Sequence, residues 1–194
     1  MNLQRINSLL VICIVTLNLY LVAMPFAPKV AFWLKKRDGH TQATLQKAIH
    51  TKPTTVTSKA EPAGNRLTIP SITIDEPIQE SNTVMRGGVW HITHTSTPDK
   101  GGNTVIIGHR FTYTNPFGTF YNLDKLKLGD EVGVTWHGKK YIYDVAQTKV
   151  VEPTEMSVED PSTTDELTLY TCTPLYFPKN RLVVISDLKE IITP

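Results

Sequence analysis

The first pattern along the chain is a long stretch without charged residues. From Ile6 to Pro28 there is no Asp, Glu, Lys or Arg, and most of the 23 positions are apolar. A hydrocarbon core about 30 Å thick requires about 20 apolar residues in a helix, so the stretch predicts one N-terminal transmembrane anchor at residues 1–28. A cleaved signal peptide is the alternative, but residues 23–27 (Ala-Met-Pro-Phe-Ala) match a small-x-small cleavage site poorly.

Residues 29–64 lack the pattern of a folded element. From residue 38 onward this part holds no Phe, Trp or Tyr and is rich in Thr, Lys, Ala and Pro. Such a composition offers little apolar surface to bury, so we expect a flexible juxtamembrane linker. The residues around Thr44–Ile49 are compatible with a short helix.

From residue 65 to 194 the pattern changes to short runs with a period of two. Residues 67–69 alternate, Pro70-Ser71 interrupts the run, and residues 72–74 alternate in the other phase. This predicts an edge strand with a break. Residues 104–107 form a continuous apolar run, as expected for a strand that is buried on both faces.

The second half of this region repeats the pattern. Alternating residues 132–136 and 141–145 flank His137-Gly138, which predicts a hairpin. Residues 167–169 and 182–185 predict two late strands. No long segment shows a helical stripe, so we expect an all-β domain, a closed barrel or a sandwich with short helical turns.

Charge is distributed unevenly along the chain. Residues 1–64 carry eight basic and two acidic side chains, and residues 65–194 carry twelve basic and sixteen acidic ones, within a formal net charge of +2. This balance excludes a globally basic nucleic-acid binder, and two cysteines exclude a disulfide-rich scaffold. A basic N-terminal segment followed by a mildly acidic region indicates a membrane-proximal segment and then a soluble domain.

Cys172 is the only thiol of the predicted domain. The other cysteine, Cys13, lies in the predicted membrane helix, where we interpret it as structural. In a domain that faces outward, an unpaired thiol is a liability unless it has a chemical role. Cys172 follows the predicted strand 167–170, and the rim at a strand end is where sites are usually built. A buried core cysteine is the alternative.

Two basic side chains can assist this thiol. The thiolate is the reactive form, and a nearby cation favours it. His109 follows the buried strand 105–107 after Gly108, and Arg181 opens the last apolar strand, nine residues after Cys172. Nine residues are enough to leave through a loop and return along a neighbouring strand. We therefore expect Cys172, His109 and Arg181 to converge on one rim of the barrel.

These residues resemble the signature of a known family. Residues 168–172 (Thr-Leu-Tyr-Thr-Cys) match the Thr-Leu-x-Thr-Cys motif of the sortases, the bacterial cysteine transpeptidases. Arg181 and the Gly-His-Arg of residues 108–110 fit the same family, and residues 67–72 and 123–130 resemble two further stretches of it. The resemblance covers residues 65–190. It implies a closed, sortase-like β-barrel of about eight strands with Cys172, His109 and Arg181 on one face.

The resemblance also implies an activity. Sortases cleave a C-terminal sorting signal, often Leu-Pro-x-Thr-Gly, of a secreted protein and pass the acyl group to an amine, usually of a peptidoglycan precursor. Cys172 then forms a thioester, His109 transfers protons, and Arg181 donates to the oxyanion or to substrate carbonyls. Thr171, Leu169 and His91 are implied as substrate-binding residues, His91 because residues 87–91 resemble a stretch close to the active face.

Partners and location follow from the same resemblance. We expect a single-pass protein of the cell membrane with an extracellular catalytic domain at residues 65–194. Its partners are secreted proteins with a sorting signal, an amine acceptor and the membrane, and no nucleic acid. Lys29 and residues 35–37, which are basic and follow the predicted span, favour the opposite orientation under the positive-inside rule. We expect the extracellular orientation because the catalytic chemistry requires it.

No cofactor is required by these residues. His91, His94 and His109 could be imagined as metal ligands, but nothing fixes their geometry, and we predict no metal site. Residues 152–166 hold six acids and no base, which indicates a solvated loop or a surface that attracts a cationic amine. In sortases the loop before the Cys strand helps to bind the sorting signal, and some members bind calcium there.

Two other functions compete with this interpretation. L,D-transpeptidases also place His before Cys on a β scaffold, but their Cys lies in a Ser-x-Gly-Cys-x-Arg context that residues 170–174 do not match. A membrane-tethered β-barrel without catalysis, acting as a binding module, is the second alternative. It has no reason to keep Cys172 more reactive than a surface thiol.

Overall fold

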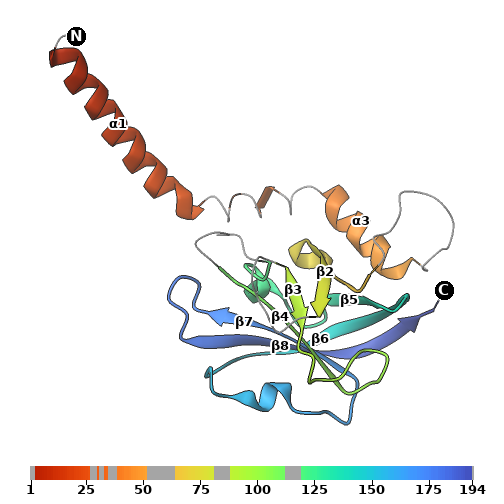
Figure 1. The fold of residues 1–194 in the computed structure, drawn as a ribbon. Coiled ribbons are helices and arrows are strands. Elements are labelled where there is room, and N and C mark those ends of the chain that lie inside the picture. The colour runs from red at the N-terminus through yellow and green to blue at the C-terminus, as the bar shows by residue number, and fades with distance from the viewer. Residues whose placement is uncertain are drawn as a thin grey trace. The chain divides into compact units, whose positions relative to one another are not determined.

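The computed structural model describes residues 3–26, 30, 33–34, 39–51, 64–80, 88–111 and 119–193. They divide into two compact units, Met1–Asp38 and Gly39–Pro194. The first holds α1 (Leu3–Ala23) and the 3-10 helix η1 (Met24–Phe26). Within α1, Ile6–Ala23 is the only stretch of the described residues that is long and apolar enough for a helix to cross a membrane (Figure 1). By length and composition it fits a membrane anchor or a signal sequence.

Eight strands close a β-barrel in the second unit. They are β1 (Arg66–Ile69), β2 (Ile74–Glu80), β3 (Val89–His91), β4 (Asn103–Gly108), β5 (Glu131–Trp136), β6 (Lys139–Val151), β7 (Glu166–Thr173) and β8 (Asn180–Ile192). Their order around the barrel is β1-β2-β3-β4-β7-β8-β6-β5, and β5 pairs with β1 to close it. β2 is parallel to β3 and β4 to β7, whereas the other neighbours are antiparallel. The closed barrel of about eight strands expected from the sequence is confirmed.

The turns form where the sequence predicts them. The interruption after β1 is the 3-10 helix η2 (Pro70–Ile72), and Thr73 adopts a φ of 56° before β2 begins. The hairpin turn between β5 and β6 consists of His137 and Gly138, with φ of 47° and 79°. Positive φ at both central residues is the geometry of a type I′ turn, whose twist matches that of the flanking strands.

An apolar cluster is formed by residues of β4, β7, β8 and the segment before β7. In this cluster Val158 of the 3-10 helix η4 (Met156–Glu159) packs with Val105, Tyr170 and Val183, one from each of the three strands. Another 3-10 helix, η3 (Leu123–Lys125), buries Leu123 completely. Buried side chains therefore fix η4, which lies between β6 and β7, and η3, which lies between β4 and β5, to the barrel.

The segment before the barrel contains a helix, α3 (Gly39–His50), which is longer than the short helix compatible with the sequence around Thr44–Ile49. It belongs to the same compact unit as the barrel. Ile49 is 3% exposed and packs on β5 at Gly133, where a Cβ would lie 3.0 Å from Ile49 Cγ1. The residues that we expected to form a flexible linker thus include a docked helix. The domain limits drawn from the sequence stay a prediction.

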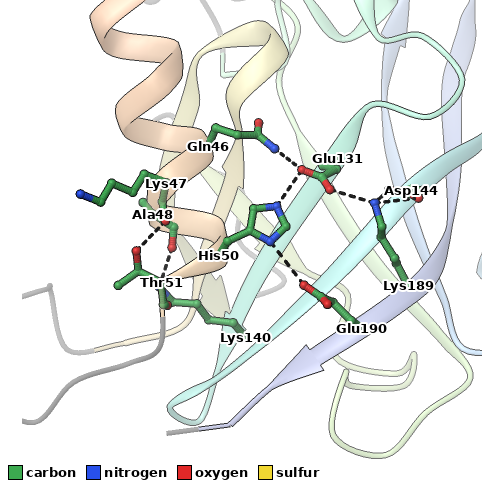
Figure 2. A network of polar contacts seen from close by, with 10 residues as sticks. All are labelled: Gln46, Lys47, Ala48, His50, Thr51, Glu131, Lys140, Asp144, Lys189 and Glu190. Atoms are coloured by element: carbon green, nitrogen blue, oxygen red, sulfur yellow. Dashed lines mark hydrogen bonds and ion pairs between the residues drawn. The ribbon is translucent and has the colours of Figure 1, made fainter.

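Polar contacts fix the end of α3 to the barrel (Figure 2). The Lys140 ammonium on β6 donates to the carbonyl oxygens of Ala48 at 2.6 Å and Thr51 at 2.9 Å. A cation at a helix C-terminus satisfies carbonyls that have no intrahelical partner and complements the helix dipole. The His50 ring lies between the carboxylates of Glu131, at 3.0 Å, and Glu190, at 3.3 Å.

Candidate active site

Cys172 lies one residue before the end of β7. The sequence indicated a position just after the strand, but the backbone still pairs with β8 there, and the partner of Cys172 is Arg181. Residues directly opposite in an antiparallel pair carry their side chains on the same face, about 5 Å apart at Cβ. The Cys172 thiol is free and exposed, and Arg181 is its cross-strand neighbour.

His109 follows Gly108, the last residue of β4. β4 and β7 are parallel, and the last backbone pair between them is Ile107 with Tyr170. These two residues are 63 positions apart in the sequence, and Gly108 and Thr171 are separated by the same offset. The Thr171 hydroxyl extends this pairing, since it donates a 2.7 Å hydrogen bond to the Gly108 carbonyl oxygen. Continuing the same offset by one residue sets His109 level with Cys172.

The backbone and the ring of His109 both have defined neighbours. Its carbonyl oxygen accepts a 3.0 Å hydrogen bond from the Phe120 amide. Its ring meets the Trp90 ring edge-on, with 5.7 Å between the centroids. Position 108 requires glycine, because a Cβ there would lie 2.8 Å from the Phe120 ring. These contacts orient His109 at the end of β4.

Arg181 is oriented by an aromatic ring and a carboxylate. Its guanidinium lies over the Tyr170 ring, 5.0 Å from the centroid, and its Nη1 is 3.8 Å from Oε1 of Glu159. The Tyr170 hydroxyl donates a 2.6 Å hydrogen bond to the same oxygen. Burial raises the pKa of Tyr170, and the hydrogen bond and charge of Glu159 raise it further, so the phenol remains a donor at neutral pH. Tyr170 and Cys172, two positions apart on β7, point to the same face.

A thiol, an imidazole and a guanidinium thus stand at the adjoining ends of β4, β7 and β8. In a comparison with known protein families, the sortase-domain family profile matches residues 67–189 of this chain. The chain belongs to the sortase family. The family that the sequence motifs indicated is confirmed, and with it the enzyme class, that of the cysteine transpeptidases.

Individual sortases show the extent of the similarity. Sortase SrtE1 of Streptomyces coelicolor is 32% identical over 133 residues, covering 61% of this chain and 37% of that protein. Sortase A of Bacillus anthracis is 26% identical over 208 residues and is covered, like this chain, to 97%. The crystal structure of Sortase E1 from Streptomyces coelicolor, with a tripeptide in its active site, has a TM-score of 0.59 and 30% identity over 66% of this chain and 89% of that one.

Three other predicted site residues of this sortase are buried. Leu169 is completely buried, and the Thr171 hydroxyl is engaged by Gly108. His91 is 3% exposed, its Nε2 lies 2.8 Å from the Ser96 carbonyl oxygen, and its ring packs edge-on against Trp136 at 5.2 Å. The structure therefore gives these side chains partners other than Cys172. Their role in substrate binding stays a prediction.

Three residues of the site were not predicted from the sequence. Arg110 bonds to Thr173 beside Cys172, and Tyr170 and Glu159 orient Arg181. Arg110 belongs to the Gly-His-Arg motif, and an arginine directly after a candidate histidine is the signal that could have indicated it. Tyr170 stood at the variable position of the Cys motif. Nothing in the sequence distinguished Glu159 from the other acids of its loop.

A hollow of about 400 Å³ lies beside the site, between residues 94–103 and residues 156–162. Cys172, His109 and Arg181 do not line it. It shares Met156 and Glu159 with the contacts of Arg181. The hollow therefore lies outside the candidate site at the strand ends.

One acid of the segment before β7 contacts the candidate site. The carboxylate oxygens of Glu159 are engaged by Tyr170 and by His94, whose Nε2 is 2.9 Å away. Among the described residues, no three His, Cys, Asp or Glu side chains are grouped so that they could hold a metal.

Proposed function

We propose that this sortase cleaves a C-terminal sorting signal, of the Leu-Pro-x-Thr-Gly kind, and transfers the acyl group to an amine of the cell envelope. The observation that supports this is the convergence of three strand ends. The β7/β8 pairing joins Cys172 to Arg181, and the offset between β4 and β7 sets His109 level with Cys172. A nucleophile, a proton donor and acceptor, and a fixed cation are what acyl transfer requires.

The first half of the reaction forms an acyl-enzyme. The Cys172 thiolate attacks the scissile carbonyl carbon, and the new carbon–sulfur bond leaves a negative charge on the carbonyl oxygen. When this intermediate collapses, the carbon–nitrogen bond breaks and protonated His109 gives its proton to the leaving amine. The product is a thioester on Cys172, and one difficult step has become two easier ones.

The second half restores the enzyme. The nitrogen of the incoming amine attacks the thioester carbonyl, and neutral His109 takes the proton that this nitrogen loses. Collapse breaks the carbon–sulfur bond and releases the Cys172 thiolate. Hydrolysis follows the same route when water replaces the amine.

Arg181 stabilises the oxyanion in both halves. Its guanidinium stays charged at any working pH and offers several donors in a fixed plane. Tyr170 and Glu159 hold it in place before the substrate arrives, so little reorganisation is needed when charge develops on the carbonyl oxygen. Its exposure at the side chain, 22%, leaves donors accessible to a substrate.

The acylation test uses the full chain in detergent micelles. The protein is incubated with peptides that vary around Leu-Pro-x-Thr-Gly, and intact mass spectrometry detects an adduct. We expect a thioester that disappears in Cys172→Ala and persists in Cys13→Ser. Aminolysis of the trapped adduct by glycine oligomers and by other amines then identifies the acceptor class. A wild-type chain that forms no adduct with any peptide, while its Cys172 reacts no faster than an ordinary surface thiol, would instead indicate a binding module.

We propose further that the N-terminal helix anchors the protein in the cell membrane by a single pass, with the barrel outside. A Cys13→Ser chain leaves Cys172 as the single thiol, and this thiol is exposed. We expect a membrane-impermeant maleimide to label it on intact cells. Labelling only after the cells are broken would place the barrel in the cytoplasm, in agreement with the basic residues that follow the helix.

A further inference from the structure

Arg110 is a buried arginine that ties three segments together next to the candidate site. It follows His109 and is 8% exposed. Its Nη1 donates a 2.7 Å hydrogen bond to the Thr173 hydroxyl, and its Nη2 lies 3.1 Å from a carboxylate oxygen of Asp124 in η3. Its Nε donates to the Tyr121 carbonyl oxygen at 3.4 Å. One guanidinium therefore joins the end of β4, the end of β7 and the η3 segment.

The Arg110–Thr173 bond continues the pairing of β4 with β7 beyond the strands. The backbone pairing ends at Ile107 and Tyr170. Two side-chain hydrogen bonds then keep the same offset of 63 residues, from Thr171 to Gly108 and from Arg110 to Thr173, both at 2.7 Å. The Thr171–Gly108 bond lies one residue before His109 and Cys172 along the two strands, and the Arg110–Thr173 bond lies one residue after them. The reacting pair is thus enclosed between two cross-links.

Arginine is the side chain that suits this position. A buried ion pair contributes little to net stability, because desolvation of the charges offsets their attraction. The planar guanidinium of an arginine can nevertheless donate to three acceptors on different segments at once. The ammonium of a lysine would reach the same acceptors with poorer geometry. Thr173 is partly exposed and Asp124 is exposed, so the arrangement costs less than a fully buried network.

We propose that Arg110 is a positioning residue, which holds the end of β4 against the end of β7 so that the His109 ring stays within reach of Cys172. The proposal rests on the acyl-transfer function proposed above. Arg110 acts through its neighbours and touches no reacting atom. Misplacement of a catalytic group by about 1 Å can cost about 100-fold in rate, so the effect belongs in kcat rather than in KM.

The test compares variants of the full chain in a Cys13→Ser background, where Cys172 is the single thiol. Arg110→Gln and Arg110→Lys remove the guanidinium. Thr173→Val removes only the acceptor on β7, and the ion pair between Arg110 and Asp124 remains. Lys140→Met is the matched control, because Lys140 is also a buried cation, at 6% exposure, but it serves the end of α3. Each variant is measured for melting temperature, for kcat and KM of thioester formation, and for the rate of Cys172 alkylation by iodoacetamide at pH 7.

We expect Arg110→Gln and Thr173→Val to lower kcat about 10- to 100-fold with KM within about twofold, and to slow alkylation. Arg110→Lys should recover only part of the loss. Lys140→Met should lower the melting temperature and leave both rates unchanged. If folded Thr173→Val and Arg110→Gln chains keep wild-type kcat and alkylation rates, the positioning role is refuted. If the wild type forms no thioester but the Arg110 variants still slow alkylation, the proposed function fails and the positioning role stands.

Discussion

The hydroxyl of Tyr170 and the carboxylate of Glu159 are joined by a 2.6 Å hydrogen bond, and Arg181 contacts both residues. Tyr170 lies on β7 and Glu159 ends η4, so the bond fixes the loop before β7 to the strand that carries Cys172. Because Val158, the neighbour of Glu159, is buried in the same cluster as Tyr170, the carboxylate has little freedom to move. The position of Arg181 therefore depends on the packing of this loop.

Substitution of Arg181 tests its role at the oxyanion. Loss of one oxyanion donor typically costs about 100- to 1,000-fold in kcat, and we expect a loss of that size in Arg181→Ala. Arg181→Lys keeps the charge but not the planar donors, so it should restore only part of the rate. Single-turnover thioester formation measures both. Lys189→Ala, on the same strand, is the control that should react like the wild type, and an Arg181→Ala chain with normal turnover would remove this role.

Gly108→Ala tests the packing that orients His109. The added methyl group would lie 2.8 Å from the Phe120 ring, so Phe120 or the end of β4 must shift. Gly133→Ala is matched, since its methyl group would lie 3.0 Å from Ile49, away from the site. We expect each change to lower the free energy of unfolding by about 1–3 kcal/mol, as overpacking does. Only Gly108→Ala should also slow thioester formation, by about 10- to 100-fold.

Urea titrations and single-turnover assays separate the two effects. Phe120→Leu in the Gly108→Ala chain makes room for the methyl group and should recover part of the rate. Equal losses of rate in the two glycine variants would mean that stability, rather than the position of His109, controls the reaction.

The sequence was sufficient for the strands and turns because their signals are local, whereas the closed barrel followed from the resemblance to the sortases. Alternation, Pro70 and the His137-Gly138 turn each act within a few residues, and the structure has strands and turns at those places. The pairing of Cys172 with Arg181 could also be predicted from the sequence, because only a short loop separates the two predicted strands. In β3, Trp90 contacts His109, whereas His91 is buried on the opposite face of the strand. The role of His91 in substrate binding stays a prediction.

Contacts between distant residues could not be predicted from one sequence. The α3 helix buries Ile49 but has a mostly polar sequence, and its end is held by Lys140, 92 residues after Ala48. The Arg110–Thr173 bond spans 63 residues. No local pattern marks such partners, because each depends on how the strands are arranged around the barrel.

Buried tyrosines should limit the stability of the barrel in alkali. Burial is the main cause that raises the pKa of Tyr143 and of Tyr170, whereas tyrosines in the unfolded chain titrate near pH 10. Above about pH 10 the folded protein therefore binds more protons than the unfolded chain, and the free energy of unfolding falls as the pH rises. Urea titrations between pH 8 and 11 should show a shallower fall in Tyr143→Phe and Tyr170→Phe. Tyr20→Phe, in α1, should keep the wild-type slope, and parallel curves for all four chains would contradict the prediction.

Glu131 should control the acid stability of the α3 contact. Burial raises the pKa of this carboxyl, but hydrogen bonds and charges from Lys189 and His50 lower it more, and the net pKa lies below the usual range. Gln46 of α3 also donates to this carboxylate (Figure 2). An unfolded Glu titrates near pH 4.3, so the stabilisation is complete above that pH and is lost as the pH falls through the lower folded value.

We therefore expect the free energy of unfolding to fall below about pH 4.3 in the wild type and to fall less steeply in Glu131→Gln. Glu152→Gln is the control, because Glu152 is exposed and its removal should leave the slope unchanged. Amide hydrogen exchange of α3 over the same pH range locates the effect. Exchange in α3 should rise in acid before exchange in β7 does, since Glu131 holds the helix and not the strand of Cys172. If both elements open together at every pH, α3 is part of one cooperative unit and the carboxylate acts on the whole barrel.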